Sequence, residues 1–233
     1  MSDTLYAPSQ VERFSDAFYL LLSGIFLTAL TVGNVVGVTK FVDLGIFVIP
    51  AGLLAYPITF LATDLMSEIY GRRRAQQLVW VGFVMNFFML GLMALGHALP
   101  DAAGVSGARS TFDTVYAFMK PNVLASMVAY LVAQSVDVQA FHFWKRLTKG
   151  RHLWLRNNFS TIGSQLIDTI LILSILYASG GLGADIDSVA ALGALMLSSY
   201  SFKVAFALVD TPFFYLGVWL LQRRAGIQAE TVG

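Results

Sequence analysis

The chain has 233 residues, of which 57% are hydrophobic, 12% are charged and none is cysteine, and its formal net charge is +1. Soluble domains carry about 25% charged residues, so this composition excludes an ordinary soluble domain and indicates a protein dissolved in lipid. The lack of cysteine excludes disulfide bonds, cysteine-ligated zinc and thiol catalysis.

Charged residues divide the sequence into six apolar stretches. A helix of about 20 apolar residues, rising about 1.5 Å per residue, crosses a hydrocarbon core of about 30 Å. By this measure the predicted transmembrane helices cover roughly residues 17–38, 45–69, 77–97, 123–144, 159–179 and 190–221. No linker or low-complexity segment separates them, so we expect an all-α membrane protein with a single transmembrane domain over residues 1–233. The first stretch is too long for a cleavable signal peptide, and we expect it to be retained.

The basic residues occupy alternate connections between these helices. They follow the second, fourth and sixth helices, at Arg72, Arg73, Arg74, Lys145, Arg146, Lys149, Arg151, Arg156, Arg223 and Arg224. The other connections hold fewer basic residues, beside several aspartates. By the positive-inside rule, connections rich in Lys and Arg lie in the cytoplasm, so both termini are predicted to be cytoplasmic.

Polar side chains recur inside the predicted helices, where an ionised group costs about 2.5–3.5 kcal/mol at the centre of the bilayer. They are Asn34, Asp64, Glu68, Gln134, Asp137, Gln139, Gln165, Asp168, Lys203 and Asp210. On several helices two of them are three, four or seven residues apart and therefore share a helix face. We expect a polar chamber between the second, fourth, fifth and sixth helices, with Asp64, Asp137 and Asp168 central and Lys203 nearby. The alternative is a set of interhelical bonds that only hold the bundle together, for which one or two such residues would suffice.

Motifs for other chemistry are missing from the sequence. There is no G-x-x-x-x-G-K-[ST] loop for ATP, no H-E-x-x-H and no G-x-S-x-G. Asp64 and Glu68 form a D-x-x-x-E pair that could hold a divalent ion, but a single such pair is common by chance. We expect no metal, no cofactor and no enzymatic activity, and an intramembrane enzyme is kept only as a third alternative.

Four segments resemble motifs of the queuosine-precursor transporters and follow the same order as in that family. They are YPITFLATDLMSEIYG at 56–71, QSVDV at 134–138, SQLIDT at 164–169 and SYSFKV at 199–204. The resemblance implies a six-helix importer of the bacterial inner membrane that moves a 7-deazaguanine by alternating access. Its cargo would be 7-cyano-7-deazaguanine or its aminomethyl relative, salvaged for the transfer-RNA nucleoside queuosine. The same family resembles the substrate-binding subunits of vitamin importers that need a separate ATPase, which is the main alternative.

The residues offer the groups that such a base requires. A guanine-like edge presents two adjacent donors that one carboxylate accepts, and its O6 accepts from an amide or ammonium group. The carboxylate candidates are Asp64, Asp137 and Asp168. The donor candidates are Asn34, Gln134, Gln165 and Lys203. The candidates for stacking on the flat ring are Phe60, Phe141, Tyr200 and Phe202.

Two further carboxylates are candidates for coupling or gating. They are Glu68 and Asp210, and Glu68 is alternatively an interfacial partner of Arg72. The expected partners are the 7-deazaguanine and the lipid bilayer, with a homodimer as an option, and no nucleic acid.

Overall fold

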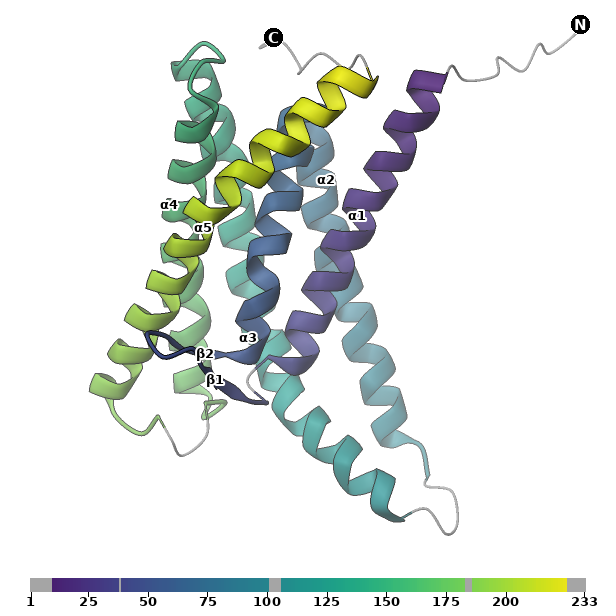
Figure 1. Cartoon of the computed structure of the whole chain (residues 1–233). Coiled ribbons are helices and arrows are strands. Elements are labelled where there is room, and N and C mark those ends of the chain that lie inside the picture. The colour runs from purple at the N-terminus through teal and green to yellow at the C-terminus, as the bar shows by residue number, and fades with distance from the viewer. Residues whose placement is uncertain (1–9, 38, 101–105, 183–185, 226–233) are drawn as a thin grey trace, which may run out of the picture.

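The computed structural model describes residues 10–37, 39–100, 106–182 and 186–225. These residues form a bundle of helices with a small antiparallel hairpin (Figure 1). The elements, in chain order, are α1 (Gln10–Val36), β1 (Phe41–Asp43), β2 (Val48–Pro50), the 3-10 helix η1 (Ala51–Ala55), α2 (Tyr56–Ala98), α3 (Ser106–Leu147), α4 (Leu153–Ala178) and α5 (Val189–Ala225). Each of the five α-helices contains a stretch long and apolar enough to cross a membrane. The prediction of a helical, multi-pass membrane protein is confirmed.

Five helices stand where six were predicted, because the second and third predicted helices form one element, α2. Gly71 interrupts α2 with φ 82° and ψ 170°, a backbone conformation that is essentially restricted to glycine. The ribbon reverses there (Figure 1). Tyr56 and Asn86 are equally far from Gly71 along the chain and both meet Asn34, which lines a cavity with Tyr56 and donates a hydrogen bond to Asn86 Oδ1 (2.8 Å). The two halves of α2 therefore run antiparallel without a loop between them.

Residues 45–55, predicted as the start of a helix, form the hairpin and η1 instead. Asp43 Oδ1 accepts a hydrogen bond from Gly45 N (2.8 Å), and Gly45 has φ 83°, so the chain turns rather than continuing as a helix. Helix α2 begins only at Tyr56, with a proline in its first turn, where proline is tolerated. Ser198 of α5 accepts from Val48 N (3.0 Å) and donates to Val48 O (2.9 Å). These bonds fix the hairpin against α5.

The remaining helices match the predictions with shifted ends. Helix α4 begins at Leu153 rather than at 159, so Arg156 lies inside the helix and not in a connection. Helix α3 begins at Ser106 rather than at 123, with Pro121 inside it. A proline within a helix removes a hydrogen bond and bends it. The first part of α3 consequently diverges from the bundle together with the end of α2 (Figure 1).

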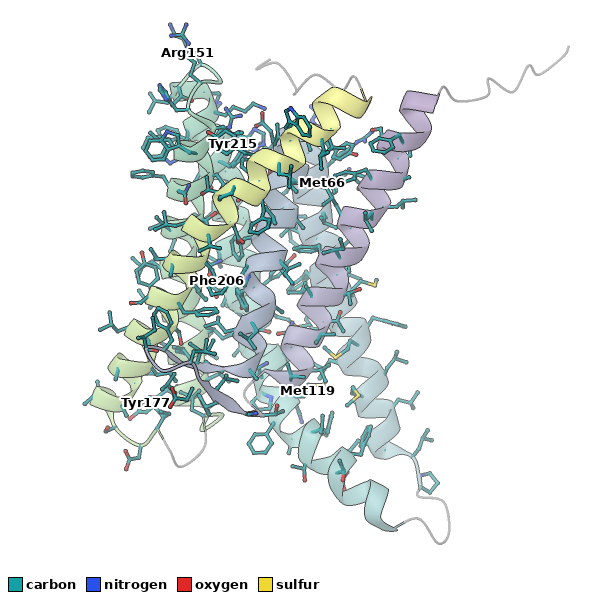
Figure 2. The ribbon with its side chains drawn as sticks, in the orientation of Figure 1. Met66, Met119, Arg151, Tyr177, Phe206 and Tyr215 are labelled. Carbon is teal, nitrogen blue, oxygen red and sulfur yellow. The ribbon has the colours of Figure 1, made fainter. Side chains whose placement is uncertain are left out.

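The connections between the helices lie at two opposite ends of the bundle. Helix α1 begins and α5 ends at the same end as the reversal within α2 and the α3–α4 connection, which carries Arg151 (Figures 1 and 2). We call this the basic end, because the runs Arg72, Arg73, Arg74 and Lys145, Arg146, Lys149, Arg151 lie there. The β1–β2 hairpin and Tyr177, near the end of α4, lie at the opposite end, which we call the hairpin end (Figure 2). The start of α1 and the end of α5 therefore lie at the same end of the bundle.

Replacing Gly71 tests whether the reversal of α2 depends on one residue. A Cβ at φ 82° and ψ 170° is strained by about 1–3 kcal/mol, so Gly71→Ala should lower the thermal unfolding midpoint in detergent. The matched control is Gly91→Ala, because Gly91 is helical and an added Cβ there meets no atom within 4 Å. Equal unfolding midpoints for the two variants would contradict the conclusion that the reversal of α2 depends on Gly71.

Candidate functional site

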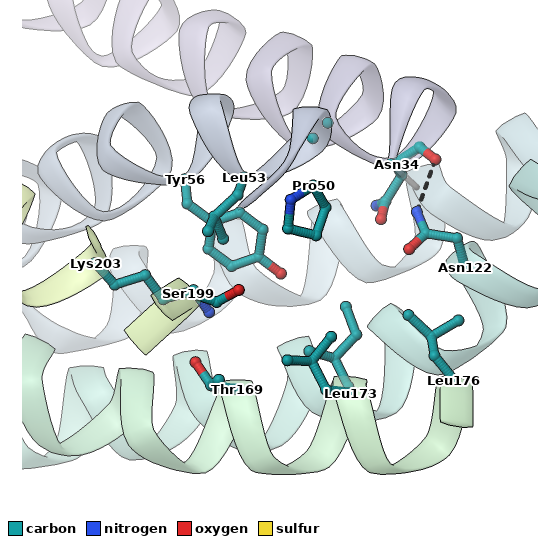
Figure 3. Close-up of a pocket in the computed structure, with 14 residues that line it drawn as sticks. Asn34, Pro50, Leu53, Tyr56, Asn122, Thr169, Leu173, Leu176, Ser199 and Lys203 are labelled. Carbon is teal, nitrogen blue, oxygen red and sulfur yellow. Dashed lines mark hydrogen bonds between the residues drawn. The ribbon is translucent and has the colours of Figure 1, made fainter. Parts of the chain in front are cut away.

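A cavity lies between α1, η1, α3, α4 and α5, toward the hairpin end (Figure 3). Its empty volume of about 460 Å³ includes the open space at its mouth. Two smaller cavities, of about 380 and 240 Å³, adjoin it and share Tyr56 with it. We call the three together the chamber. Its polar lining residues include Asn34, Tyr56, Asn122, Gln134, Gln165, Asp168, Thr169, Ser199, Lys203 and Asp210.

A buried ion pair stands at the centre of the chamber. Lys203 Nζ of α5 lies 2.6 Å from Asp168 Oδ2 of α4, and the two side chains are 3% and 1% exposed. The same ammonium lies 4.4 Å from the centroid of the Tyr56 ring, a cation–π distance. The chamber thus places a carboxylate, an ammonium group and an aromatic face side by side.

Three polar side chains of the chamber have atoms that bond to nothing in the described part of the chain. They are Gln134 Oε1, Gln165 Oε1 and Ser199 Oγ, all buried. Burying a polar atom without a partner costs free energy, so a bound polar molecule could supply the missing bonds. Asn34 differs, because its amide donates to Asn86 Oδ1 (2.8 Å) and accepts from Ser126 Oγ (2.6 Å). Asn34 therefore braces α1 against α2 and α3 while it lines the cavity.

Asp64 and Asp137, which were expected at the centre of the chamber, line none of its three cavities. Asp64 Oδ2 accepts a hydrogen bond from Thr161 Oγ1 (3.3 Å), and Asp137 Oδ1 accepts from Ser164 Oγ (2.9 Å). Both carboxyl groups are buried, and they lie within hydrogen-bonding reach of each other. We call Asp64 and Asp137 the carboxyl pair. It lies closer to the basic end than the chamber does, because Asp64 is two turns of α2 beyond Tyr56.

A third polar group closes the interior at the basic end. Glu68 Oε1 lies 2.7 Å from Arg156 Nη2, and Glu68 Oε2 lies 3.4 Å from Lys145 Nζ, with all three side chains buried. Arg156 also donates to Gly150 O (2.9 Å). The expected partner of Glu68, Arg72, is exposed, since it follows the reversal at Gly71. We call these three side chains the Glu68 cluster.

Spacing along α2 explains how the three groups are stacked. Tyr56, Phe60, Asp64 and Glu68 follow at intervals of four residues, about 6 Å along the axis, and so share one face of the helix. From the hairpin end to the basic end, this face meets the chamber, then the carboxyl pair and then the Glu68 cluster.

Of the four stacking candidates, Phe60 lines the chamber, and its ring stacks on Tyr56 with centroids 6.3 Å apart. The other three line none of the three cavities. Phe141 and Phe202 are fully buried in packing against other aromatic rings, and Tyr200 donates to Ile162 O (3.4 Å). Their positions favour packing over stacking on a ligand.

Sequence reasoning missed several residues of this interior. Tyr56 is the first letter of the longest motif, so the motif itself pointed to it. Asn86 is an amide in an otherwise apolar stretch, a signal that was overlooked. Arg156 and Lys145 were assigned to the cytoplasmic basic cluster, although they pair with Glu68 inside the bundle. Within the described residues, no three His, Asp or Glu side chains come together as metal ligands.

Comparison with known proteins identifies relatives of the chain. A family profile described as "Putative vitamin uptake transporter" matches residues 50–217. A "Probable queuosine precursor transporter" of Bacillus subtilis (strain 168) is 30% identical over 183 residues, which are 76% of this chain and 75% of the relative. The "Queuosine precursor transporter" of Escherichia coli (strain K12) is 27% identical over 169 residues, 72% of each chain. No solved structure gives a significant match.

The matched region contains the ion pair of the chamber, the carboxyl pair and the Glu68 cluster. The relatives are named as transporters, which confirms the prediction of a transporter rather than an enzyme. The resemblance that the four motifs carried is also confirmed. The chain belongs to the family described as "Putative vitamin uptake transporter", and its relatives are named queuosine precursor transporters.

Proposed function

We propose that the protein imports a queuosine precursor, 7-cyano-7-deazaguanine or 7-aminomethyl-7-deazaguanine, across a bacterial inner membrane by alternating access around the chamber. One observation carries this proposal: the carboxylate of Asp168, the ammonium of Lys203 and the ring of Tyr56 lie next to one another and line adjoining cavities of the chamber. The names of the relatives supply the class of cargo. The single domain over residues 1–233 and the homodimer stay predictions.

The groups in the chamber match the edges of a 7-deazaguanine. Asp168 has lone pairs beyond the one that meets Lys203, and it accepts from the N1 and amino donors of the base. Lys203 donates to the O6 acceptor. Tyr56 and Phe60 offer ring faces on which the flat base stacks. The unpaired atoms of Gln134, Gln165 and Ser199 meet the remaining polar atoms of the ligand.

The basic end faces the cytoplasm in this proposal, as the positive-inside rule requires. Helix α1, the two halves of α2, and helices α3, α4 and α5 then make six spans with both termini in the cytoplasm. The chamber lies toward the outer side, and the Glu68 cluster separates it from the cytoplasm. Import requires this cluster to part, which gives Glu68 the role of a gate.

A binding subunit of an ATPase-driven vitamin importer is the second candidate. The description of the matching family, which names vitamin uptake, favours it. Such a subunit would bind its cargo in the same chamber, but would move it only with a separate ATPase.

A thermal-shift panel tests the class of cargo. A ligand that binds only the native state stabilises it, by about 2.7 kcal/mol at a hundred times its dissociation constant. Both 7-deazaguanines should raise the unfolding midpoint of the purified protein, while adenine, riboflavin and biotin should not. Stabilisation by a vitamin alone would contradict the proposed cargo.

Paired substitutions separate recognition from stability at the ion pair. Asp168→Asn alone leaves the Lys203 ammonium buried without a partner and should cost about 3–5 kcal/mol of stability. The double variant Asp168→Asn with Lys203→Met removes both charges and should regain most of that stability. Because a hydrogen bond to a charged group contributes about 1.5–3 kcal/mol, this double variant should bind the base at least about tenfold more weakly in calorimetry. If the double variant binds the base as tightly as the unmodified protein does, the Asp168–Lys203 pair stabilises the fold and does not recognise the base.

Reconstitution of the purified chain into liposomes separates the two candidates. A solitary carrier should accumulate labelled 7-cyano-7-deazaguanine under an ion gradient without ATP, and should lose the accumulation when the gradient is dissipated. Binding without any uptake under every gradient would favour the ATPase-dependent subunit.

A further inference from the structure

The carboxyl pair holds two acidic groups in an interior that offers them few donors. Asp64 and Asp137 are 2% and 0% exposed, and each accepts a bond from one hydroxyl of α4, Thr161 or Ser164. The second oxygen of each carboxyl group, Asp64 Oδ1 and Asp137 Oδ2, bonds to nothing else in the described part of the chain. The two carboxyl groups lie beside each other, and a further hydroxyl close to Asp137, that of Ser160, donates to Asn157 O (3.1 Å).

The charged groups around the pair do not supply the missing donor. From α3 and α4, Lys145 and Arg156 both bind Glu68 of α2. Lys203 of α5 binds Asp168 of α4. Asp210 of α5, the remaining charged group that acts on Asp64, is itself acidic. Two ionised carboxylates so close together in a dry interior would repel each other strongly.

We propose that the carboxyl pair is a proton-binding site: Asp64 and Asp137 share one proton, which enters from the outer side and leaves to the cytoplasm with each imported substrate. A proton held between the two carboxyl groups removes the repulsion and gives one carboxyl group a donor toward the other. Hydrogen-bonding reach between the oxygens suits a proton and leaves little room for a metal ion between them. The role in transport rests on the proposed function, and makes the protein a proton-coupled importer.

The surroundings of the pair provide an entrance and an exit. Thr161 donates to Asp64 and also lines the smallest cavity of the chamber, so it connects the pair with the outer side. On the other side, Glu68 follows Asp64 by one turn of α2, and the Glu68 cluster separates the pair from the basic end. Parting of this cluster admits water to the protonated pair, and the proton leaves to the cytoplasm. One proton and one molecule of the base then move inward together.

Uptake by proteoliposomes tests the coupling. With an acidic exterior, the unmodified protein should concentrate labelled 7-cyano-7-deazaguanine, and a protonophore should abolish the accumulation. Asp64→Asn and Asp137→Asn should lose accumulation while they still bind the base in detergent. Asp16→Asn, which removes an exposed carboxylate at the basic end, is the matched control and should accumulate normally. Full accumulation by both pair variants, or accumulation driven by a sodium gradient alone, would overturn the proposal.

An infrared measurement tests the proton without any substrate. The unmodified protein should show a band of a protonated carboxylic acid that shifts in deuterated water and is lost in Asp137→Asn. If Asp137→Asn does not fold, Ser164→Ala should shift the same band, because Ser164 donates to Asp137. A band unchanged in these variants would overturn the proton site. If the band behaves as expected but no 7-deazaguanine binds the unmodified protein, only the proposed cargo fails.

Discussion

Hydrocarbon does not hydrate a charge, and the interior of this bundle is organised by that constraint. Asp168 is neutralised by Lys203, and Glu68 by Arg156 and Lys145, in each case with side chains from different helices. The bonds therefore both remove the cost of the buried charges and tie α2, α3, α4 and α5 together. Among the described residues, the carboxyl groups of Asp64 and Asp137 have no basic side chain as a partner, and they lie beside each other instead.

The three polar groups differ in net charge along the axis of the bundle. The ion pair in the chamber is neutral, the carboxyl pair is acidic, and the Glu68 cluster carries one more positive than negative group. The chamber, which Asp210 also lines, presents both signs of charge to an entering base, whereas a proton that passes from the chamber toward the basic end meets first the carboxyl pair and then the positively charged Glu68 cluster. Because the Glu68 cluster is positively charged and lies beyond the carboxyl pair, it must open before a cation can leave toward the basic end.

Much of the fold could be predicted from sequence because hydrophobic length alone locates helices in a membrane protein. The errors occur where local backbone conformation decides. Arg72 and its neighbours suggested a loop after the second predicted helix, but a single glycine reverses the chain and the helix resumes at once. The β1–β2 hairpin has strands of three residues, too short for a periodic pattern. Helix α4 begins before residue 159, and its first turn places Arg156 beside the buried Glu68, a partner that no local pattern reveals.

The site could be predicted only as a set of polar residues. Spacing indicates which side chains share a helix face, but not how far each helix is rotated toward its neighbours. Asp168 and Lys203 meet, and so do Asp64 and Asp137, yet their division into two separate groups depends on that rotation. Tyr56 begins the longest motif, but its position at the start of a helix is also a common place for packing, and the cavity around it shows which of the two applies.

The paired bonds between Ser198 and Val48 have a mechanical consequence. They attach the hairpin, which borders the chamber at the hairpin end, to the helix that carries Lys203 little more than a turn further on. As long as both bonds hold, a displacement of the hairpin is transmitted to α5 and so to the ammonium group that faces the cavity.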